Sequence, residues 1–306
     1  MNRATFNKAV VPGLLDFAVA GYQLKNKEQE WRKMVSVRSS KRAYEEIAYF
    51  AALGLIPKKP EGTAITYDDF VQGPTKRWTH VTYGLGCTIT EEMIEDALYP
   101  DIPTRMESIT RELGSSARET LNIIVFNMYN NLTSTTYHTG ADALALASGS
   151  HTQLRGGTWS NLLSPAADLS ASSLQTAIDN FETQKDDTGK RQILKAAKIL
   201  VHPNNAWKAK ELLNSGYDPE SANNAVNTLK ERNLQLMVTP YYTDTDGFTL
   251  IADPPNNSVG PIAFLRRNVN FAKDGDFETG DAKFKTTFRF SIETGSARNL
   301  YHSAGA

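Results

Sequence analysis

The chain has 306 residues, of which 40% are hydrophobic and 22% are charged, and its formal net charge at pH 7 is −1. This composition excludes wholesale disorder, and near-neutrality argues against a protein that grips phosphate backbones, because that task needs an excess of Lys and Arg. No apolar run approaches the roughly 20 residues of a membrane helix, and the first residues lack the apolar segment of a secretory signal. The single cysteine, Cys87, excludes an internal disulfide. We therefore expect synthesis in a reducing cytoplasm and no membrane partner.

Residues 1–55 contain helical patterns without an obvious packed unit, and we interpret them as an N-terminal arm. Lys41–Leu53 is followed by Gly54 and Pro57, which end helices. Its apolar residues have helical spacing: Tyr44, Ile47, Ala48 and Ala51. The pattern predicts one amphipathic helix near the end of the arm.

Residues 56–89 carry a hairpin signal. Thr63–Val71 and Arg77–Thr88 are rich in Thr, Ile, Val, Tyr and Trp, and the Gly/Pro segment Gln72–Lys76 lies between them. Neither strand has a decisively apolar face, and a two-stranded ribbon is marginal in isolation. If the ribbon is ordered, another surface must support it.

Residues 90–190 are dominated by helical patterns. Thr90 caps a predicted helix that ends at Pro100, and a second predicted helix runs from Thr104 to Leu132. The second helix keeps one apolar stripe, spaced roughly 3.7 residues apart, and spans roughly 42 Å. The stripe comprises Met106, Ile109, Leu113, Ala117, Leu121, Ile124, Met128 and Leu132. After loop-like residues 133–170, Ser170 caps a helix with Leu174, Ala177, Ile178 and Phe181 on one face.

Residues 191–260 alternate between strand and helix patterns, which predicts an α/β subdomain. The predicted elements are a strand at Ala196–Val201, helices at Ala206–Asn214 and Pro219–Asn233, and strands at Leu234–Val238 and Thr249–Ala252. Residues 261–306 are mostly β, with predicted strands at Ile262–Leu265, Val269–Phe271 and Phe284–Ile292. The expected fold class is α+β.

The search for catalytic and metal sites is largely negative. The sequence has no Walker A, G-x-S-x-G or H-E-x-x-H motif. Its five histidines are scattered, and Cys87 has no cysteine partner. Asp244-x-Asp246-Gly247 resembles part of a calcium loop, but a hairpin turn is the better interpretation, because the first and last ligand positions are wrong. We therefore expect no enzyme activity, cofactor or metal.

The aromatic residues of the ribbon admit two functions. Trp78 and Tyr83 have the π-faces on which nucleobases stack, but hairpin aromatics more often pack against a neighbouring protein surface. An arm and a ribbon without faces of their own fit a repeated building block whose neighbours supply the missing surface. The alternative is a monomeric α+β protein whose ribbon folds back on its own body.

The order of these elements, together with several local strings, resembles the major capsid protein of tailed bacteriophages, in particular the head subunits of the Mu-like type. The likeness extends over most of the chain from about residue 56, and its specificity comes from the order of the strings. These are 157–163 (GTWSNLL), 199–203 (ILVHP), 236–242 (LMVTPYY), 276–281 (DFETGD), 286–291 (TTFRFS) and 297–302 (ARNLYH), with Ala206, Ala209, Leu212 and Leu213 after the second.

The resemblance implies a shell fold with an arm at 1–55 and an extended loop at 56–89. A peripheral domain at 90–190 would contain the spine helix 104–132, an axial domain would occupy 191–260, and 261–306 would return to the peripheral domain. The extended loop of such proteins lies over an adjacent subunit. The residues expected to make that contact are Ile65, Tyr67, Phe70, Lys76, Trp78, Val81 and Tyr83. A subunit should fold without a strap of this kind. Deletion of Ile65–Thr82 is therefore expected to leave a folded subunit that forms no stable shell.

The implied function is a major head subunit that self-assembles as pentamers and hexamers into an icosahedral shell. The shell would be built in the bacterial host cytoplasm and would enclose double-stranded DNA in the virion without sequence-specific binding. A separate scaffold protein is expected, because no scaffolding segment precedes the arm, along with a portal and decoration proteins. Some relatives cross-link through a loop lysine, but the partner of Lys58, Lys59 or Lys76 cannot be identified among 21 Asn, so no cross-link is predicted.

Two alternative functions remain open. The first is a cargo-enclosing nanocompartment of the same fold. The second is a cytoplasmic α/β enzyme that uses His202 and nearby acids such as Asp253. On the capsid interpretation, the net charge of −1 suits a container, since a basic wall would hold the DNA in place.

Overall fold

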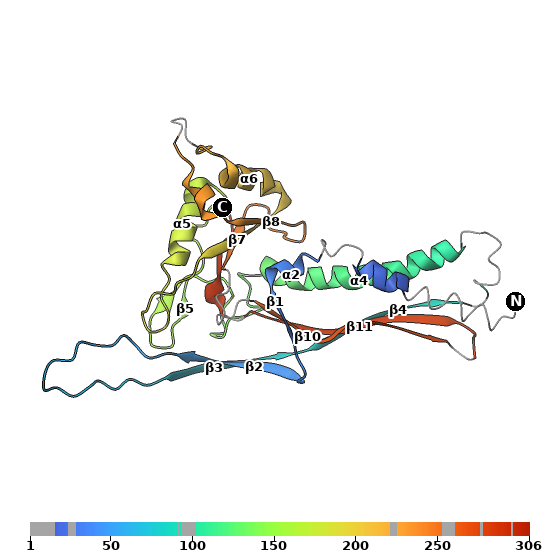
Figure 1. Cartoon of the computed structure of the whole chain (residues 1–306), viewed down its shortest axis with the longest axis horizontal. Coiled ribbons are helices and arrows are strands. Elements are labelled where there is room, and N and C mark those ends of the chain that lie inside the picture. Colours follow the sequence, from blue (N-terminus) through green and yellow to red (C-terminus); the bar gives the residue numbers. More distant parts are fainter. Residues whose placement is uncertain are drawn as a thin grey trace. The chain divides into compact units, whose positions relative to one another are not determined.

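The computed structural model describes residues 16–23, 29–90, 92, 102–220, 225–252, 261–275, 278–294 and 296–306 (Figure 1). The chain forms two compact units. The first unit contains Met1–Glu45, Trp78–Val125 and Ala263–Glu293, and the second contains Glu46–Arg77, Phe126–Ile262 and Thr294–Ala306. Within the described ranges, no helix combines the length and the apolarity that crossing a bilayer requires.

The first unit packs a long helix against a four-stranded sheet. The helix α4 runs over Ile102–Asn130, and the sheet has the order β1-β10-β11-β4. These strands are β1 (Ser36–Ser39), β10 (Ile262–Gly275), β11 (Ala282–Glu293) and β4 (Val81–Ile89), and the short helix α2 (Trp31–Met34) precedes β1. Alternate residues of β11, including Phe284, Phe288 and Phe290, are buried, and Phe284 packs with Leu113 of α4. The period of two on β11 therefore meets the helical stripe of α4 in one core.

Residues 16–23 are helical and cross α4 at close range in the first unit. A Cβ atom on Gly114 would lie 2.1 Å from the carbonyl oxygen of Ala18, and one on Gly21 would lie 2.1 Å from that of Arg111. The two glycines thus allow the backbones to approach each other. Arg118 fixes the crossing by donating from Nη1 to the carbonyl oxygen of Gly21 at 3.1 Å.

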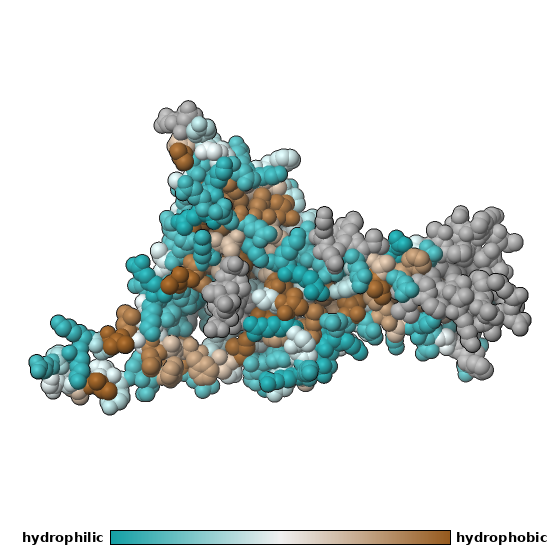
Figure 2. Space-filling model, viewed as in Figure 1, coloured by the Kyte–Doolittle hydropathy of each residue, from teal (hydrophilic) through white to brown (hydrophobic). Residues whose placement is uncertain are grey.

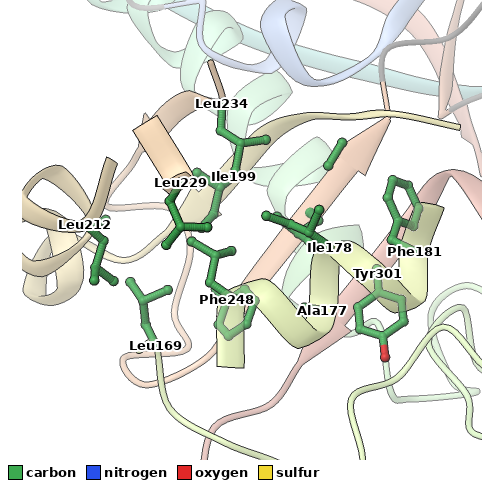
Figure 3. Packing of buried hydrophobic residues seen from close by; sticks show 14 of the residues in the cluster. Leu169, Ala177, Ile178, Phe181, Ile199, Leu212, Leu229, Leu234, Phe248 and Tyr301 are labelled. Atoms are coloured by element: carbon green, nitrogen blue, oxygen red, sulfur yellow. The ribbon is translucent and has the colours of Figure 1, made fainter. Parts of the chain in front are cut away.

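The second unit contains an α/β layer with an apolar core. Its sheet has the order β12-β9-β7-β8, in which β7 pairs with β8 in parallel and with β9 antiparallel. The strands are β7 (Ala196–Val201), β8 (Gln235–Val238), β9 (Phe248–Ala252) and β12 (Leu300–Ser303). The helices α5 (Ala171–Glu182) and α6 (Ala206–Asn214) bury their apolar faces against one side of this sheet. Figure 3 shows side chains from the helices and the strands meeting in this interior.

The remaining elements of the second unit are short or two-stranded. They are the ribbon of β2 (Tyr44–Ala51) and β3 (Val71–Thr79), the pair β5 (His151–Thr152) and β6 (Thr158–Trp159), and the 3-10 turns η1 (Pro203–Asn205), η2 (Thr228–Arg232) and η3 (Ala297–Asn299). Residues 52–70, between β2 and β3, form no helix or strand. From here on, the name extended loop means these residues, in place of the predicted bounds 56–89.

Most elements expected from the sequence are confirmed. The spine helix, the Ser170-capped helix, the strand at 196–201, the helix at 206–214 and the strands at 234–238, 249–252 and 284–292 all lie within one to three residues of their predicted bounds. The side chain of Ser170 accepts a hydrogen bond from the backbone N–H of Ser173, and the side chain of Ser173 accepts one in return. The two strands predicted at 262–271 are one continuous strand, β10.

The predicted helix at Lys41–Leu53 is wrong. Residues Tyr44–Ala51 form strand β2, which pairs with β3. The spacing of four apolar residues suggested a helix, but the segment is also rich in Tyr, Ile and Phe, which favour strands when a partner is present. That partner lies more than 20 residues away, so local periodicity did not reveal it.

The predicted hairpin has the right region but the wrong pairing. The Gly/Pro segment Gln72–Lys76 lies inside strand β3, and the predicted strand Thr63–Val71 is mostly extended loop. β4 belongs to the sheet of the first unit, where it pairs antiparallel with β11. The ribbon is therefore built from β2 and β3, and its turn is the 19-residue extended loop.

The predicted helix at Pro219–Asn233 is also wrong. The described part of this segment contains only the 3-10 turn η2. The Asn227 side chain accepts from the Leu229 N–H and donates to the carbonyl oxygens of Leu212 and Ser215, so local side-chain bonds replace a helical ladder. The helix predicted after Thr90 falls mostly outside the described residues.

Candidate assembly surface

The extended loop and the ribbon carry the largest group of exposed apolar side chains in the described part of the second unit. Ile56 is 97% exposed and Tyr67 is 85% exposed. The other members are Phe50, Leu53, Leu55, Ile65, Phe70 and Val71. Figure 2 shows brown apolar patches along this part of the chain. Soluble monomers rarely leave so much apolar surface uncovered in one segment, and such surface marks an interaction site.

The base of the ribbon is packed tightly against its own unit. Lys76 on β3 donates to the hydroxyl of Thr139 at 2.8 Å and also to the carbonyl oxygens of Thr139 and Gly140. A Cβ atom on Gly73 would lie 2.7 Å from the side chain of Leu154, so a larger residue there would require the Leu154 side chain to move. The ribbon therefore starts from a fixed base.

Near the end of the loop, Asp68 joins three segments of the second unit. Its Oδ1 accepts from Nη1 of Arg155 at 2.8 Å, and its Oδ2 accepts from the backbone N–H of Gly54 at 2.6 Å. Arg155 also donates from Nη2 to the carbonyl oxygen of Asp69 at 2.6 Å. The hydrogen bond from Arg155, followed by that from Gly54, lowers the pKa of Asp68 to about 2. The carboxylate is therefore ionised at any physiological pH.

The seven contact residues predicted from the sequence fall into three groups. Ile65, Tyr67 and Phe70 lie on the extended loop and are exposed, and Val81 at the start of β4 is half exposed. Lys76 is engaged by Thr139 and Gly140. Trp78 is only 8% exposed, and Tyr83 stacks on Phe288 at a ring-centroid distance of 5.1 Å, so both pack within their own chain. That packing leaves little of Trp78 for a neighbour.

Sequence reasoning missed the exposed apolar residues that lead from the end of β2 into the extended loop, which are Phe50, Leu53, Leu55 and Ile56. The predicted arm ends at residue 55, so only Ile56 of these four falls within the predicted extended loop. A useful signal was available, since four large apolar residues stand within seven positions just before Pro57 and Pro60. Prolines prevent both a helix and a central strand there, so nothing local can bury those side chains.

Residues that had suggested catalysis occupy structural positions. His202 caps η1 by accepting the Asn204 N–H on Nδ1 at 3.1 Å, and Asp253 lies outside the described residues. Asp244 accepts the N–H groups of Asp246 and Gly247, so the segment is a turn. It is not the predicted hairpin turn, because β7 lies between β8 and β9 in the sheet. Burial raises the pKa of the Cys87 thiol, which disfavours the reactive thiolate. Over the described ranges, no three His, Cys, Asp or Glu side chains cluster as metal ligands.

One buried histidine links three segments of the second unit. His151 contacts Asp142 through Nδ1 at 2.7 Å and Asn161 through Nε2 at 3.1 Å. Its ring stacks on Trp159 at 4.4 Å. Burial raises the pKa of Asp142, but the hydrogen bond from His151 and the contacts after it outweigh burial and lower the pKa overall. These contacts tie β5 and β6 to the loop that contains Asp142.

Solved structures of shell proteins share this fold. A virus-like particle from Pyrococcus furiosus matches with 12% identity and a TM-score of 0.52, over 95% of this chain and 97% of that chain. The holo-SrpI encapsulin complex from Synechococcus elongatus PCC 7942 matches with 9% identity and a TM-score of 0.53, over 90% and 87%. The capsid of Myoviridae phage XM1 matches with 12% identity and a TM-score of 0.53, over 89% and 90%. At these identities the likeness concerns the fold, and it confirms the predicted α+β capsid fold.

Sequence comparison supplies the family. No curated protein matches the chain significantly. A family model described as phage capsid protein matches residues 73–303, which include α4, the α/β layer and every strand of the first unit's sheet except β1. The match thus extends over most of the chain. The chain belongs to the phage capsid protein family.

Proposed function

We propose that this chain is the major head subunit of a tailed phage, which self-assembles as pentamers and hexamers into an icosahedral shell around double-stranded DNA. The observation that carries the proposal is the family match over residues 73–303. The Mu-like subtype, the partition into arm, extended loop, peripheral and axial domains, and assembly in the host cytoplasm belong to the same proposal. A separate scaffold protein, a portal and decoration proteins would be its partners.

In this proposal the extended loop is a strap that lies on a neighbouring subunit. Support comes from its exposed apolar side chains, since a loop with Ile56 and Tyr67 almost wholly exposed lacks a surface that covers it. A second copy of the chain is the natural source of that surface in a closed shell, where every subunit presents the same strap and the same receiving face. Many such weak contacts sum over the shell.

A loop deletion tests the strap. Deletion of Ile65–Thr82 would remove β3 together with the buried residues Trp78 and His80, so failure of that variant to assemble would report misfolding. Deletion of 55–67 with a two-residue Gly-Gly bridge is sharper, because the flanking residues Gly54 and Asp68 already touch. We expect a folded subunit, by circular dichroism and thermal unfolding, that forms no stable shells by electron microscopy. Normal shells from this deletion would overturn the strap role.

A nanocompartment is the second candidate, and the match to the encapsulin complex supports it. Nucleic-acid content separates the two functions. Native particles of a phage head should carry nuclease-protected DNA and a strong 260 nm absorbance, whereas a nanocompartment should carry protein cargo. The third candidate, a cytoplasmic enzyme, predicts a monomer or a dimer of 33.8 kDa chains in sedimentation rather than a shell.

The net charge of −1 fits the container role. Packed DNA has to enter and leave the shell, and a wall with many phosphate contacts would retard both movements. We therefore expect particle-bound DNA to dissociate from disrupted shells at moderate salt, without the steep salt dependence of a basic nucleic-acid-binding surface. A steep dependence would contradict the container hypothesis.

A further inference from the structure

The extended loop is hydrogen-bonded within its own subunit near both of its ends, at Leu53, Gly54 and Asp68. The most exposed residues of the loop lie between these contacts, within 55–67. Backbone pairing within the loop is sparse, so the free part would sample many directions if nothing oriented its base.

Two tight turns of the second unit make these contacts with the loop. The turn 153–157 presents Arg155, and its backbone closes through the Gln153 N–H donating to the Gly157 carbonyl oxygen at 3.1 Å. Gly156 and Gly157 have φ angles of +93° and +96°, a left-handed backbone that favours glycine. The turn 186–190 presents Lys190, whose Nζ donates to the carbonyl oxygen of Leu53 at 2.5 Å. One turn therefore holds the return limb and the other holds the outgoing limb.

The two turns are linked to each other by a buried arginine. Arg298, which is 6% exposed, donates from Nη2 to Asp187 of the second turn at 2.8 Å. Its Cζ lies 4.1 Å from the ring centroid of Trp159 on β6, the strand that follows the first turn. Trp159 in turn stacks on His151 of β5. The two turns are thus connected through one stack of side chains, in which Arg298 and His151 are buried.

We propose that these two turns form a clasp that sets the direction of the extended loop before assembly, with Arg155 and Asp68 as its positioning residues. The inference rests on the proposed function, because the clasp matters only if the loop has a neighbour to reach. A loop already aimed at its receiving face loses less conformational entropy on contact than a free one. The clasp therefore lowers the subunit concentration at which shells form, without itself touching the neighbour.

The chain offers a matched control for the clasp. Arg77 and Glu46 form another exposed ion pair, at 3.6 Å, and both residues belong to the ribbon strands β2 and β3 rather than to the extended loop. Arg155→Ala and Arg77→Ala therefore each remove one arginine from an ion pair of the ribbon or loop, and only the first opens the clasp.

The experiment measures loop freedom and assembly in the same full-length variants. Hydrogen exchange and limited proteolysis of unassembled subunits report on residues 52–70, and light scattering gives the threshold concentration for shells. We expect Arg155→Ala and Asp68→Ala to raise loop cleavage and the assembly threshold about threefold to fivefold, the range of an exposed ion pair, while Arg77→Ala changes neither. Arg155→Ala removes the hydrogen bonds to Asp68 and Asp69, whereas Asp68→Ala removes those from Arg155 and Gly54 to the Asp68 carboxylate. Both variants should therefore loosen mainly the return limb, because Lys190 still holds the outgoing limb at Leu53.

Several results would overturn the clasp. Unchanged loop exchange in Arg155→Ala would show that the body does not hold the loop. A freer loop with an unchanged assembly threshold would show that direction is irrelevant to assembly. Effects of Arg155→Ala and Asp68→Ala that simply add in the double variant would show that the two residues act separately. Wild-type chains that form no shells at any concentration would overturn the proposed function, and the exchange data would still report whether the body holds the loop.

Discussion

The α/β layer and the extended loop belong to the same unit but are stabilised in opposite ways. In the layer, Leu174, Phe181 and Leu250 are fully buried in one apolar cluster. In the loop, Ile56 and Tyr67 are almost fully exposed, and the contacts that order the segment are polar. The layer buries its apolar surface within one chain. The loop leaves its apolar surface exposed, and only hydrogen bonds and an ion pair hold it in position.

This contrast indicates which parts of a shell subunit fold alone and which are completed by assembly. Burial at about 25 cal/mol per Å² gives the layer a large driving force, whereas exposed ion pairs contribute at most about 1 kcal/mol each. We therefore expect substitutions in the layer to change the free energy of unfolding, and substitutions in the loop to change assembly. The following predictions test this separation, starting with the largest effect on stability.

Phe181→Ala should cost the most. The side chain is fully buried at the end of α5 and meets Tyr301 of β12 edge to face, with ring centroids 6.3 Å apart. Truncation removes apolar contact and leaves a cavity, so we expect a loss of about 3–5 kcal/mol in the free energy of unfolding, measured with denaturant. A loss below 1 kcal/mol would mean that the layer is not the stabilising core of its unit.

His302 should make the stability of the layer depend on pH. It is buried on β12, with Nδ1 3.0 Å from the Thr249 hydroxyl, and burial lowers its pKa from 6.5 to about 4. Above pH 6.5 His302 is neutral in both the folded and the unfolded state, so it does not reduce the stability. As the pH falls towards 4, only the unfolded chain takes up the proton, so up to about 3 kcal/mol is lost, and the loss levels off below pH 4.

The variant His302→Gln isolates this contribution. It should flatten the decline in stability between pH 6.5 and 4, measured by denaturant unfolding at a series of pH values. Burial also lowers the pKa of His80 and His138, so a weaker slope should remain in the variant. An unchanged slope would exclude His302 as the group that titrates.

Ser170→Ala should have an intermediate effect. Its side chain accepts the Ser173 N–H at 3.1 Å and caps the N-terminus of α5. Loss of such a cap typically costs about 1 kcal/mol, and thermal unfolding should show it. Ser170→Asp retains a capping acceptor and should restore most of the stability. If Asp fails to restore it, the cap is not the cause.

Tyr67→Ala should have the smallest effect on stability and a large effect on assembly. The side chain is 85% exposed, so we expect the free energy of unfolding to change by less than about 0.5 kcal/mol. The threshold concentration for shells should rise, because an apolar anchor of the strap is lost. Lys59→Ala, at an exposed polar position of the same loop, is the control. Equal assembly by Tyr67→Ala and Lys59→Ala would remove Tyr67 from the strap.

The same contrast explains how much the sequence predicts. In the layer, α5, β7, α6, β8 and β9 follow from periodicity and capping, because each element buries its own apolar face nearby. The spine helix follows for the same reason. Of its predicted stripe, Leu113, Ala117, Leu121, Met128 and Leu132 are buried.

The ribbon could not be predicted in this way, because its strands are ordered by pairing between segments that are distant in the sequence. Strand β2 is determined by pairing with β3, and the Gly/Pro segment that suggested a turn is inside β3, where Gly73 accommodates Leu154. The clasp could not be predicted for the same reason, since Asp68 and Arg155 are 87 residues apart in the sequence. Apolar side chains with no local partner were the one sequence signal that pointed correctly to this region.

Cryo-electron microscopy of assembled wild-type particles tests the central claim most directly. We predict closed icosahedral shells in which residues 55–67 of each subunit lie against an adjacent subunit, while Asp68 remains bound to Arg155 of its own chain. A chain that stays monomeric or dimeric at high concentration would contradict this account. Shells in which residues 55–67 face solvent would contradict it equally, because the exposed apolar loop would then have no partner.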